Sequence, residues 1–383
     1  MTIAKLQHTA QHRLGDARPL QRLHVLDAFR ALAILAVLVC HYFATWGLPE
    51  YAGNLYGYQH AYPVWLGWGA LGVEFFFIIS GFVIFMTLER CHGLLEFWAR
   101  RFARLYPAYV VAMALTFLIA NTLGPPEFAS STADFLIGLS LSTPYVSGAK
   151  FVDQVYWSLV VELQFYIAIG IVYVLAGKRF ATLWTLYAGA TLACWFIGRS
   201  LGMHMLVALA NRVFLLPYLA HFTLGIAFYF LYTGRIHRGR LLAALALSMY
   251  LLIDAQAPAV WHAMHAMMVV LFVLFLRGKL EWLAVAPLQF LGKISYSLYL
   301  VHAYIGIILI GLLTRVYRVP DLIAALGAAI ACLALAYALT ETVERPIKRT
   351  LLRWAAPLFR SSQRQWPSLA FVRPSPRAFA PRH

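Results

Sequence analysis

Apolar stretches of about twenty residues recur along nearly the whole of this 383-residue chain. Each stretch is long enough to cross the roughly 30 Å hydrocarbon core of a bilayer as a helix. The stretches are continuously apolar and do not alternate with polar residues, so they predict helices and not the strands of a barrel. Only 12% of the residues are charged, about half the share in a soluble protein. We therefore expect an all-α, polytopic integral membrane protein.

The apolar stretches predict ten membrane-spanning helices. These are residues 26–46, 66–88, 106–123, 157–177, 180–199, 213–233, 240–256, 260–277, 290–313 and 321–342. The remaining ends give a polar N-terminal tail at residues 1–25 and a basic C-terminal tail at residues 346–383, which flank a transmembrane domain at residues 26–345.

The positions of Lys and Arg predict the orientation of these helices, because basic residues accumulate in cytoplasmic loops. If both termini are cytoplasmic, cytoplasmic segments contain 24 of the 31 basic residues and outer segments contain five. This asymmetry favours ten helices with both ends inside. It also accounts for the net charge of +16, so no nucleic-acid partner is needed to explain it.

Five ionisable side chains lie within predicted spans, where they are costly and therefore candidates for function. They are His41, Glu74, Glu162, His221 and His302. With a rise of 1.5 Å per residue, their distances from the helix ends place all five at a similar depth in the membrane. This shared depth favours one functional layer. The alternative is a set of separate structural pairs.

A second group of charges lies near the cytoplasmic ends of the helices. Arg101 and Arg104 share one helix face in the segment FWARRFARLYP, and we place Arg30 and Lys293 at the same level. Such a cluster suits a phosphate-bearing ligand, although basic residues also simply anchor helices. Arg30 and His41 are about three helical turns apart on one face, so a long ligand could reach from one to the other.

Six segments give the chain a family resemblance. They are LDAFRALAILAVLVCH, GVEFFFIISGFVI, RRFARLYP, YWSLVVELQFY, LGKISYSLYLVH and ETVERP. In this order the chain resembles acyltransferase family 3, a family of integral-membrane acyltransferases. The chain departs from the usual pattern at Ala28 and Ala31, where family members often have glycine near the arginine.

The resemblance implies an O-acyltransferase of the bacterial inner membrane. The implied donor is cytoplasmic acyl-CoA, usually acetyl-CoA, and the implied acceptor is a sugar hydroxyl on a surface polysaccharide, glycolipid or glycosylated metabolite. Coenzyme A has several phosphate charges and a long arm, which matches the cationic cluster and its distance from His41. We expect no permanently bound cofactor.

The expected chemistry assigns roles within the predicted layer. His41 is the expected base, because imidazole titrates near neutral pH, and either Glu74 or Glu162 is expected to orient it. His302 is the fourth candidate catalytic residue. Three aromatic residues are candidates for stabilising the oxyanion or shaping the acceptor site, with core packing as the alternative: Trp157, Tyr296 and Tyr299.

The same residues are also compatible with other functions. A proton-coupled transporter also uses buried His and Glu, although it favours broken helices or repeats, which the sequence does not indicate. Histidines on facing helices suit haem, and Ser80 followed by Gly81 weakly suggests a serine protease. The four cysteines have no CxxC spacing, so neither disulfides nor a metal site are expected.

Overall fold

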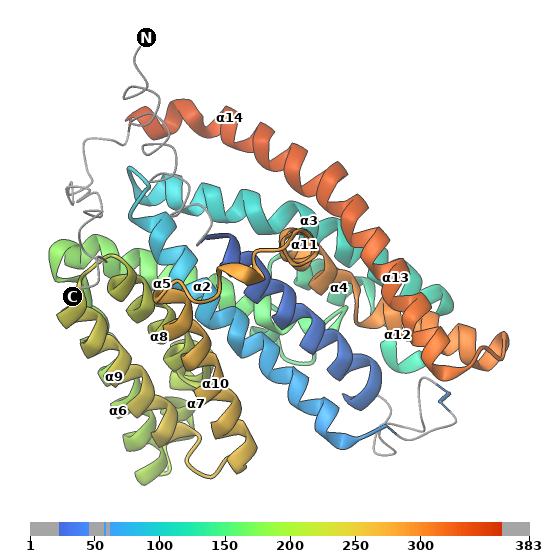
Figure 1. Cartoon of the computed structure of the whole chain (residues 1–383), viewed down its shortest axis with the longest axis horizontal. Coiled ribbons are helices and arrows are strands. Elements are labelled where there is room, and N and C mark those ends of the chain that lie inside the picture. Colours follow the sequence, from blue (N-terminus) through green and yellow to red (C-terminus); the bar gives the residue numbers. More distant parts are fainter. Residues whose placement is uncertain (1–22, 46–56, 59–61, 362–383) are drawn as a thin grey trace, which may run out of the picture.

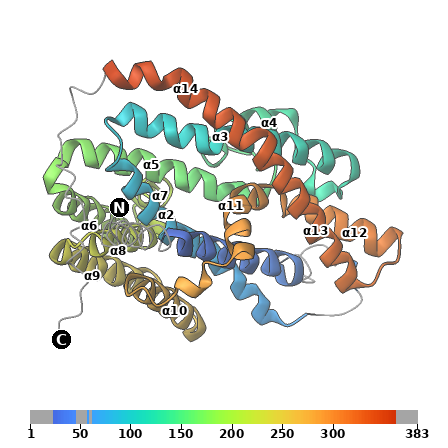
Figure 2. The same cartoon turned by 45° about the horizontal axis from the view of Figure 1, so that its top comes forward.

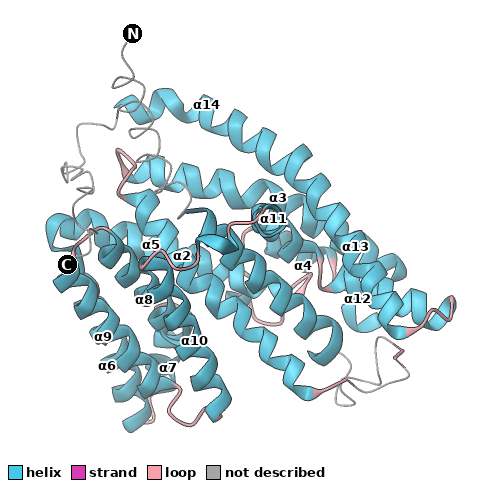
Figure 3. Cartoon of the chain, viewed as in Figure 1, coloured by secondary structure: helices cyan, strands magenta, loops and turns pink. Residues whose placement is uncertain are grey.

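The computed structural model describes residues 23–45, 57, 58 and 62–361, and all regular secondary structure within these residues is helical (Figure 3). The first helix occupies residues 23–40 and continues into a π-helical turn, His41–Thr45. The other main helices are α2 (Gly72–Leu88), α3 (Leu94–Leu123), α4 (Thr132–Leu139), α5 (Trp157–Ala176), α6 (Phe180–Ser200), α7 (His204–Arg212), α8 (Leu216–Tyr232), α9 (Ile236–Ile253), α10 (Ala259–Leu276), α11 (Ala286–Val301), α12 (Tyr304–Gly311), α13 (Asp321–Leu339) and α14 (Arg345–Ser361).

Eight helices of the described residues are long and apolar enough to cross a membrane, or nine if a bent pair is counted as one span. One of the eight, Gln154–Ser200, includes both α5 and α6. The chain reverses between these two helices, since Phe165 of α5 packs edge-on against Trp184 of α6 with ring centroids 6.1 Å apart. The polytopic all-α fold is thus confirmed. The ten expected spans are reached when α5 and α6 count separately and the bent pair counts once.

The helices form two groups that meet along the first helix and α2 (Figures 1 and 2). In one group α8 packs against α2 and α9, and α6 packs against α7. In the other group α3 packs against α11, α12 and α14. Phe29 of the first helix packs among Phe75 of α2 and Phe272 and Phe275 of α10, so apolar contacts hold one face of the first helix against α2 and α10.

Glycine allows the first helix to approach α11 closely. A Cβ atom added to Gly292 would lie 2.0 Å from the backbone carbonyl oxygen of Asp27, a distance that no side chain tolerates. Small residues at such crossings let two membrane helices pack backbone against backbone. The contact fixes the helix that carries Arg30 against the helix that carries Tyr296 and Tyr299.

The span expected as a single helix at residues 290–313 is broken. Helices α11 and α12 meet at an angle of 72°, with His302 and Ala303 between them. Asp153 stabilises the break, because its carboxylate accepts hydrogen bonds from the backbone N–H groups of Tyr304 (3.0 Å) and Val155 (3.2 Å). These are donors that a helix start and a turn leave without an intrahelical acceptor. The uninterrupted apolar pattern could not reveal the break.

Two elements extend beyond their expected ends. Helix α3 begins at Leu94 and continues through Pro107, so the arginines expected just before a span lie within its first turns. Helix α13 continues through a π-helical turn, Thr340–Glu344, into α14, which packs along α3 (Figure 1). The expected basic tail therefore begins as a helix. Its residues 362–383, and residues 1–22 of the expected N-terminal tail, lie outside the described residues.

Candidate active site

His41 and His302 form a hydrogen-bonded pair at the centre of the candidate site. Nδ1 of His41 lies 2.8 Å from Nε2 of His302, and the two rings stack with centroids 5.0 Å apart. His41 begins the π-helical turn that ends the first helix, and His302 lies at the break between α11 and α12. Both irregularities place imidazoles where regular helices would not bring them together. Single π-helical turns are common at functional sites.

The surroundings of His302 define which nitrogen of each ring carries a proton. His302 is fully buried, and its Nδ1 lies 2.8 Å from the carbonyl oxygen of Tyr299, to which it must donate. Nε2 of a neutral His302 is then an acceptor. His41 must donate to it through Nδ1, which leaves the lone pair of His41 on Nε2. His302, and not a glutamate, is thus the side chain hydrogen-bonded to His41.

A cavity of about 100 Å³ lies near this histidine pair, although neither His41 nor His302 is among its lining residues. Its wall comes from the first helix, α2, α3, α5 and α11, and its polar side chains are Arg30, Ser80, Arg101, Arg104, Ser158, Glu162, Tyr166, Ser295, Tyr296 and Tyr299. Tyr299 connects the cavity to the histidines, because its ring lies 5.6 Å from that of His302. The expected grouping of Arg30 with Arg101 and Arg104 is thus present in the structure.

The three cavity arginines differ in how they are held. Arg104 forms an ion pair with Glu344 and lies over the ring of Tyr296 at 5.4 Å. Arg30 pairs with Asp27 at 3.1 Å. The buried Nε of Arg101, in contrast, has no hydrogen-bond partner among the described residues. A buried donor without a partner is costly, so Arg101 is suited to bind an anionic ligand.

Lys348, which was expected to lie in the C-terminal tail, adds a further cation near the arginines. It lies on α14, close enough to Arg101 and Arg104 to be repelled by both. Lys293, which was expected in this cluster, is exposed and lies in a separate cavity with Glu341 and Arg345. The reason is helix rotation: Lys293 is on α11, but on a face directed away from the three arginines.

Glu162 lies in the cavity and not beside His41. Its Oε1 accepts hydrogen bonds from the hydroxyls of Tyr166 (2.6 Å) and Ser80 (3.3 Å). Tyr166 is one turn further along α5, a spacing visible in the sequence but not considered there. The carboxylate is thus held among the arginines and hydroxyls. The expectation that Glu162 could orient His41 is not supported by this geometry.

The expected oxyanion donors also have other partners. The hydroxyl of Tyr296 donates to the carbonyl oxygen of Leu105 at 2.7 Å, and that of Tyr299 donates to the carbonyl oxygen of Val155 at 3.0 Å. Their rings line the cavity, but their protons are used within the fold. Trp157 does not line the cavity. It packs on the ring of Tyr218, 5.2 Å between centroids, as the packing alternative predicted.

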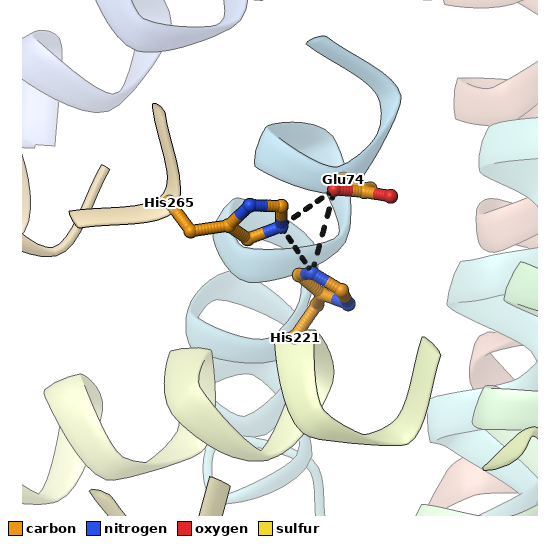
Figure 4. A group of neighbouring side chains, drawn as sticks. All are labelled: Glu74, His221 and His265. Atoms are coloured by element: carbon orange, nitrogen blue, oxygen red, sulfur yellow. Dashed lines mark hydrogen bonds and ion pairs between the residues drawn. The ribbon is translucent and has the colours of Figure 1, made fainter. Parts of the chain in front are cut away.

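Glu74 belongs to a different cluster. Its Oε2 lies 2.6 Å from Nε2 of His265 and 3.6 Å from Nε2 of His221, and it makes no contact with His41 (Figure 4). The expected pairing of Glu74 with His41 is therefore not formed. A shared depth does not imply contact, since α2 presents Glu74 towards α8 and α10. The single predicted layer is divided into three groups.

Comparison with known proteins gives a family match over most of the chain. A family model described as "Acyltransferase domain" matches residues 23–341. An "O-acetyl transferase" of Shigella phage Sf6 is 26% identical over 179 residues, which cover 43% of this chain and 51% of that protein. "O-acetyltransferase OatA" of Staphylococcus aureus (strain NCTC 8325 / PS 47) is 28% identical over 177 residues, covering 40% and 25%.

A third relative, "Acyltransferase MdmB" of Streptomyces mycarofaciens, is 29% identical over 180 residues, which cover 45% of each chain. The chain thus spans between a quarter and about half of the length of these curated relatives. No solved structure matches it.

Proposed function

Because the chain belongs to acyltransferase family 3, whose model covers residues 23–341, we propose that it is a membrane enzyme that transfers an acetyl group from acetyl-CoA to a sugar hydroxyl. Two relatives are named as O-acetyltransferases, which favours acetate over longer acyl groups. The donor binds from the cytoplasm, and the acceptor is a surface polysaccharide, a glycolipid or a glycosylated metabolite. The enzyme acts in a bacterial inner membrane.

The cavity beside the histidine pair is the observation that carries this proposal. Three arginines line a single cavity, and Tyr299 in its wall contacts His302, the partner of the expected base. The phosphates of coenzyme A bind Arg101, Arg104 and Arg30, and the pantetheine arm extends along the cavity. Arginine suits this task because its planar fork binds phosphate oxygens in pairs.

The transfer needs one base and returns its proton. Nε2 of His41 takes the proton of the acceptor hydroxyl, and the hydroxyl oxygen attacks the thioester carbon. The C–O bond forms, the C–S bond breaks, and the leaving thiolate takes the proton from the His41 imidazolium. His302 holds His41 in the required tautomer throughout, so we assign it as a positioning residue.

A proton-coupled transporter is the second candidate. The 72° break between α11 and α12 is a feature such a protein favours, and it was not visible in the sequence. The break is occupied by His302, whose side chain is fully buried. A transporter would move its substrate without acetyl-CoA and without forming an ester, which makes the two functions separable by experiment.

The test is acetyl transfer from radiolabelled acetyl-CoA in membranes that contain the protein. Base-labile radioactivity is measured in the polysaccharide, glycolipid and small glycoside fractions. A general base contributes about 10²–10⁴ in rate, so His41→Gln should lose at least the lower figure at equal protein level. His302→Gln should lose turnover with an unchanged KM for acetyl-CoA, as befits a positioning residue.

His204→Gln is the matched control, because His204 is exposed at the start of α7 and should leave transfer unchanged. If wild-type membranes form no labelled ester in any fraction, the acyltransferase assignment fails. If ester forms and His41→Gln retains more than about a tenth of wild-type turnover, His41 is not the base.

A further inference from the structure

A second cluster of buried ionisable groups lies outside the candidate active site. Glu74 of α2, His221 of α8 and His265 of α10 direct one ligand-type atom each towards a common point (Figure 4). The three atoms lie within 4.8 Å of one another, and no other described group of His, Cys, Asp or Glu side chains has this arrangement. The proposed acyl transfer does not use any of the three residues.

With a neutral His265, the close contacts within the cluster lack a proton between His265 and Glu74. Nδ1 of His265 lies 2.8 Å from the carbonyl oxygen of Trp261, so Nδ1 carries the proton and Nε2 of a neutral ring has a lone pair. That lone pair faces Oε2 of Glu74 at 2.6 Å and Nε2 of His221 at 2.9 Å. Although it is so close to His265, Oε2 makes no hydrogen bond within the described residues. Atoms this close together need a positive charge between them, which is either a proton on Nε2 of His265, paired with Glu74, or a metal ion.

The distances fit a metal ion. Bonds of about 2.0–2.1 Å in a tetrahedral site place neighbouring ligand atoms roughly 3.3 Å apart. The three observed separations, 2.6, 2.9 and 3.6 Å, lie on both sides of this value. The carbonyl that fixes the tautomer of His265 also matches metal sites, where a ligating histidine donates its other ring N–H to such a group.

We propose that Glu74, His221 and His265 bind a divalent transition-metal ion, for which Zn²⁺ best matches two imidazoles and one carboxylate. The ion joins α2, α8 and α10, and Glu74 is not among the residues of α2 that line the candidate active site, such as Phe76 and Ser80. We assign the metal a structural role, because it would hold α2 against α8 and α10 without contacting the acyl-transfer residues.

A cavity beside the cluster gives the site a route for the ion and room for a fourth ligand. It measures about 260 Å³ and is lined by His221, Tyr250, His262 and His265 together with apolar side chains. The expectation that the chain has no metal site rested on the spacing of its cysteines. The two histidines are 44 residues apart on different helices, so no short sequence motif could have revealed them.

Metal content of the full-length protein, purified in detergent without chelators, tests the proposal directly. We expect about one equivalent of metal per chain, lost on treatment with 1,10-phenanthroline and restored by Zn²⁺. Co²⁺ in its place should give the visible absorption of a four-coordinate site. Loss of even a second-shell partner weakens metal binding by 10–100-fold, so Glu74→Gln and His265→Asn should each weaken Zn²⁺ binding by more than about 100-fold.

His262→Asn is the matched control. His262 lies on the same helix and contacts the same Tyr250 (3.1 Å) as His265 does, but it is not among the three converging residues. It should keep a full equivalent of metal and bind Zn²⁺ as tightly as the wild type. Wild-type protein that binds no stoichiometric Zn²⁺ would overturn the proposal, as would equal metal content in Glu74→Gln. The wild-type measurement decides even if the variants do not fold.

Discussion

At the scale of single residues, a comparison of Arg101 with its neighbour Arg100 distinguishes ligand binding from helix anchoring. Arg101 lines the cavity with a buried Nε that has no described partner, whereas Arg100 is bound to Glu96 at 2.6 Å and does not line the cavity. A hydrogen bond to a charged group is worth about 1.5–3 kcal/mol. Arg101→Ala should therefore raise the KM for acetyl-CoA about ten-fold or more, at 1.4 kcal/mol per decade.

Arg100→Ala should leave that KM unchanged, since its ion pair with Glu96 is independent of the cavity. Initial rates at varied acetyl-CoA concentration, with protein level held equal, provide the measurement. An equal effect of both substitutions would mean that the arginines act through the general charge of the cytoplasmic surface and not through contact with the donor.

The sequence predicted the grouping of the arginines better than the partner of His41. His41 was singled out because a charge in an apolar helix is costly, whereas Arg101 and Arg104 were grouped with Arg30 by their level near the cytoplasmic face, and all three arginines do line one cavity. The pairing of His41 with His302 was missed, because spacing gives depth and facing within one helix but not how two helices are turned towards each other. The same reason explains why Glu74 was expected beside His41, whereas it lies beside His265.

At the scale of elements, Asp153 controls the break that places His302. Burial raises the pKa of the Asp153 carboxyl from its usual 3.8 to about 7. The hydrogen bonds that it accepts from two backbone N–H groups act in the opposite direction but are the smaller effect. The folded protein then keeps a proton between roughly pH 4 and pH 7 that the unfolded chain has lost. The contribution of this group to stability therefore falls as pH rises through that window.

Asp153→Asn removes this titration and leaves one backbone N–H without its acceptor. The melting temperature of the wild type should exceed that of the variant most at about pH 5, with the difference narrowing towards about pH 8. Turnover should also fall without a change in the KM for acetyl-CoA, because His302 moves and the donor site does not.

Asp134→Asn is the control for the pH series. Hydrogen bonds from the Lys150 backbone and from Ser131 lower the pKa of Asp134, so its contribution is lost only as pH falls below the usual range of an aspartate. Its effect on melting temperature should be constant from about pH 5 to about pH 8. A constant difference for Asp153→Asn as well would show that the buried carboxyl does not titrate in this window.

Helices were predictable where apolar length alone defines them, and not where polar contacts modify them. The first helix and α10 closely match their expected ranges because nothing interrupts their apolar run. The break at His302 was invisible, because it depends on a carboxylate about 150 residues away in the sequence. The continuation of α13 into α14 was missed for a related reason, since a basic segment becomes helical here by packing along α3.

At the scale of the whole molecule, the distribution of basic residues predicts which face of the membrane each loop occupies. Ser147, in the segment between α4 and α5, and Thr350, on α14, are both exposed and should lie on opposite faces. Ser147→Cys should react with a membrane-impermeant thiol reagent in intact cells, whereas Thr350→Cys should react only after the membrane is opened. Three of the four native cysteines are buried and the fourth is half-buried, so the wild-type protein measures a low background.

The labelling result has a consequence for the enzyme as well as for the fold. Thr350 is two residues from Lys348, which lies among the cavity arginines, so its side of the membrane is also the side from which a phosphate-bearing donor must enter. If the donor is acetyl-CoA, as proposed, it enters this cavity from the cytoplasm. Labelling of Thr350→Cys in intact cells would indicate the opposite orientation in the membrane, in which cytoplasmic acetyl-CoA could not be the donor. The predicted pattern, in contrast, requires the acetyl group to enter from the cytoplasmic face.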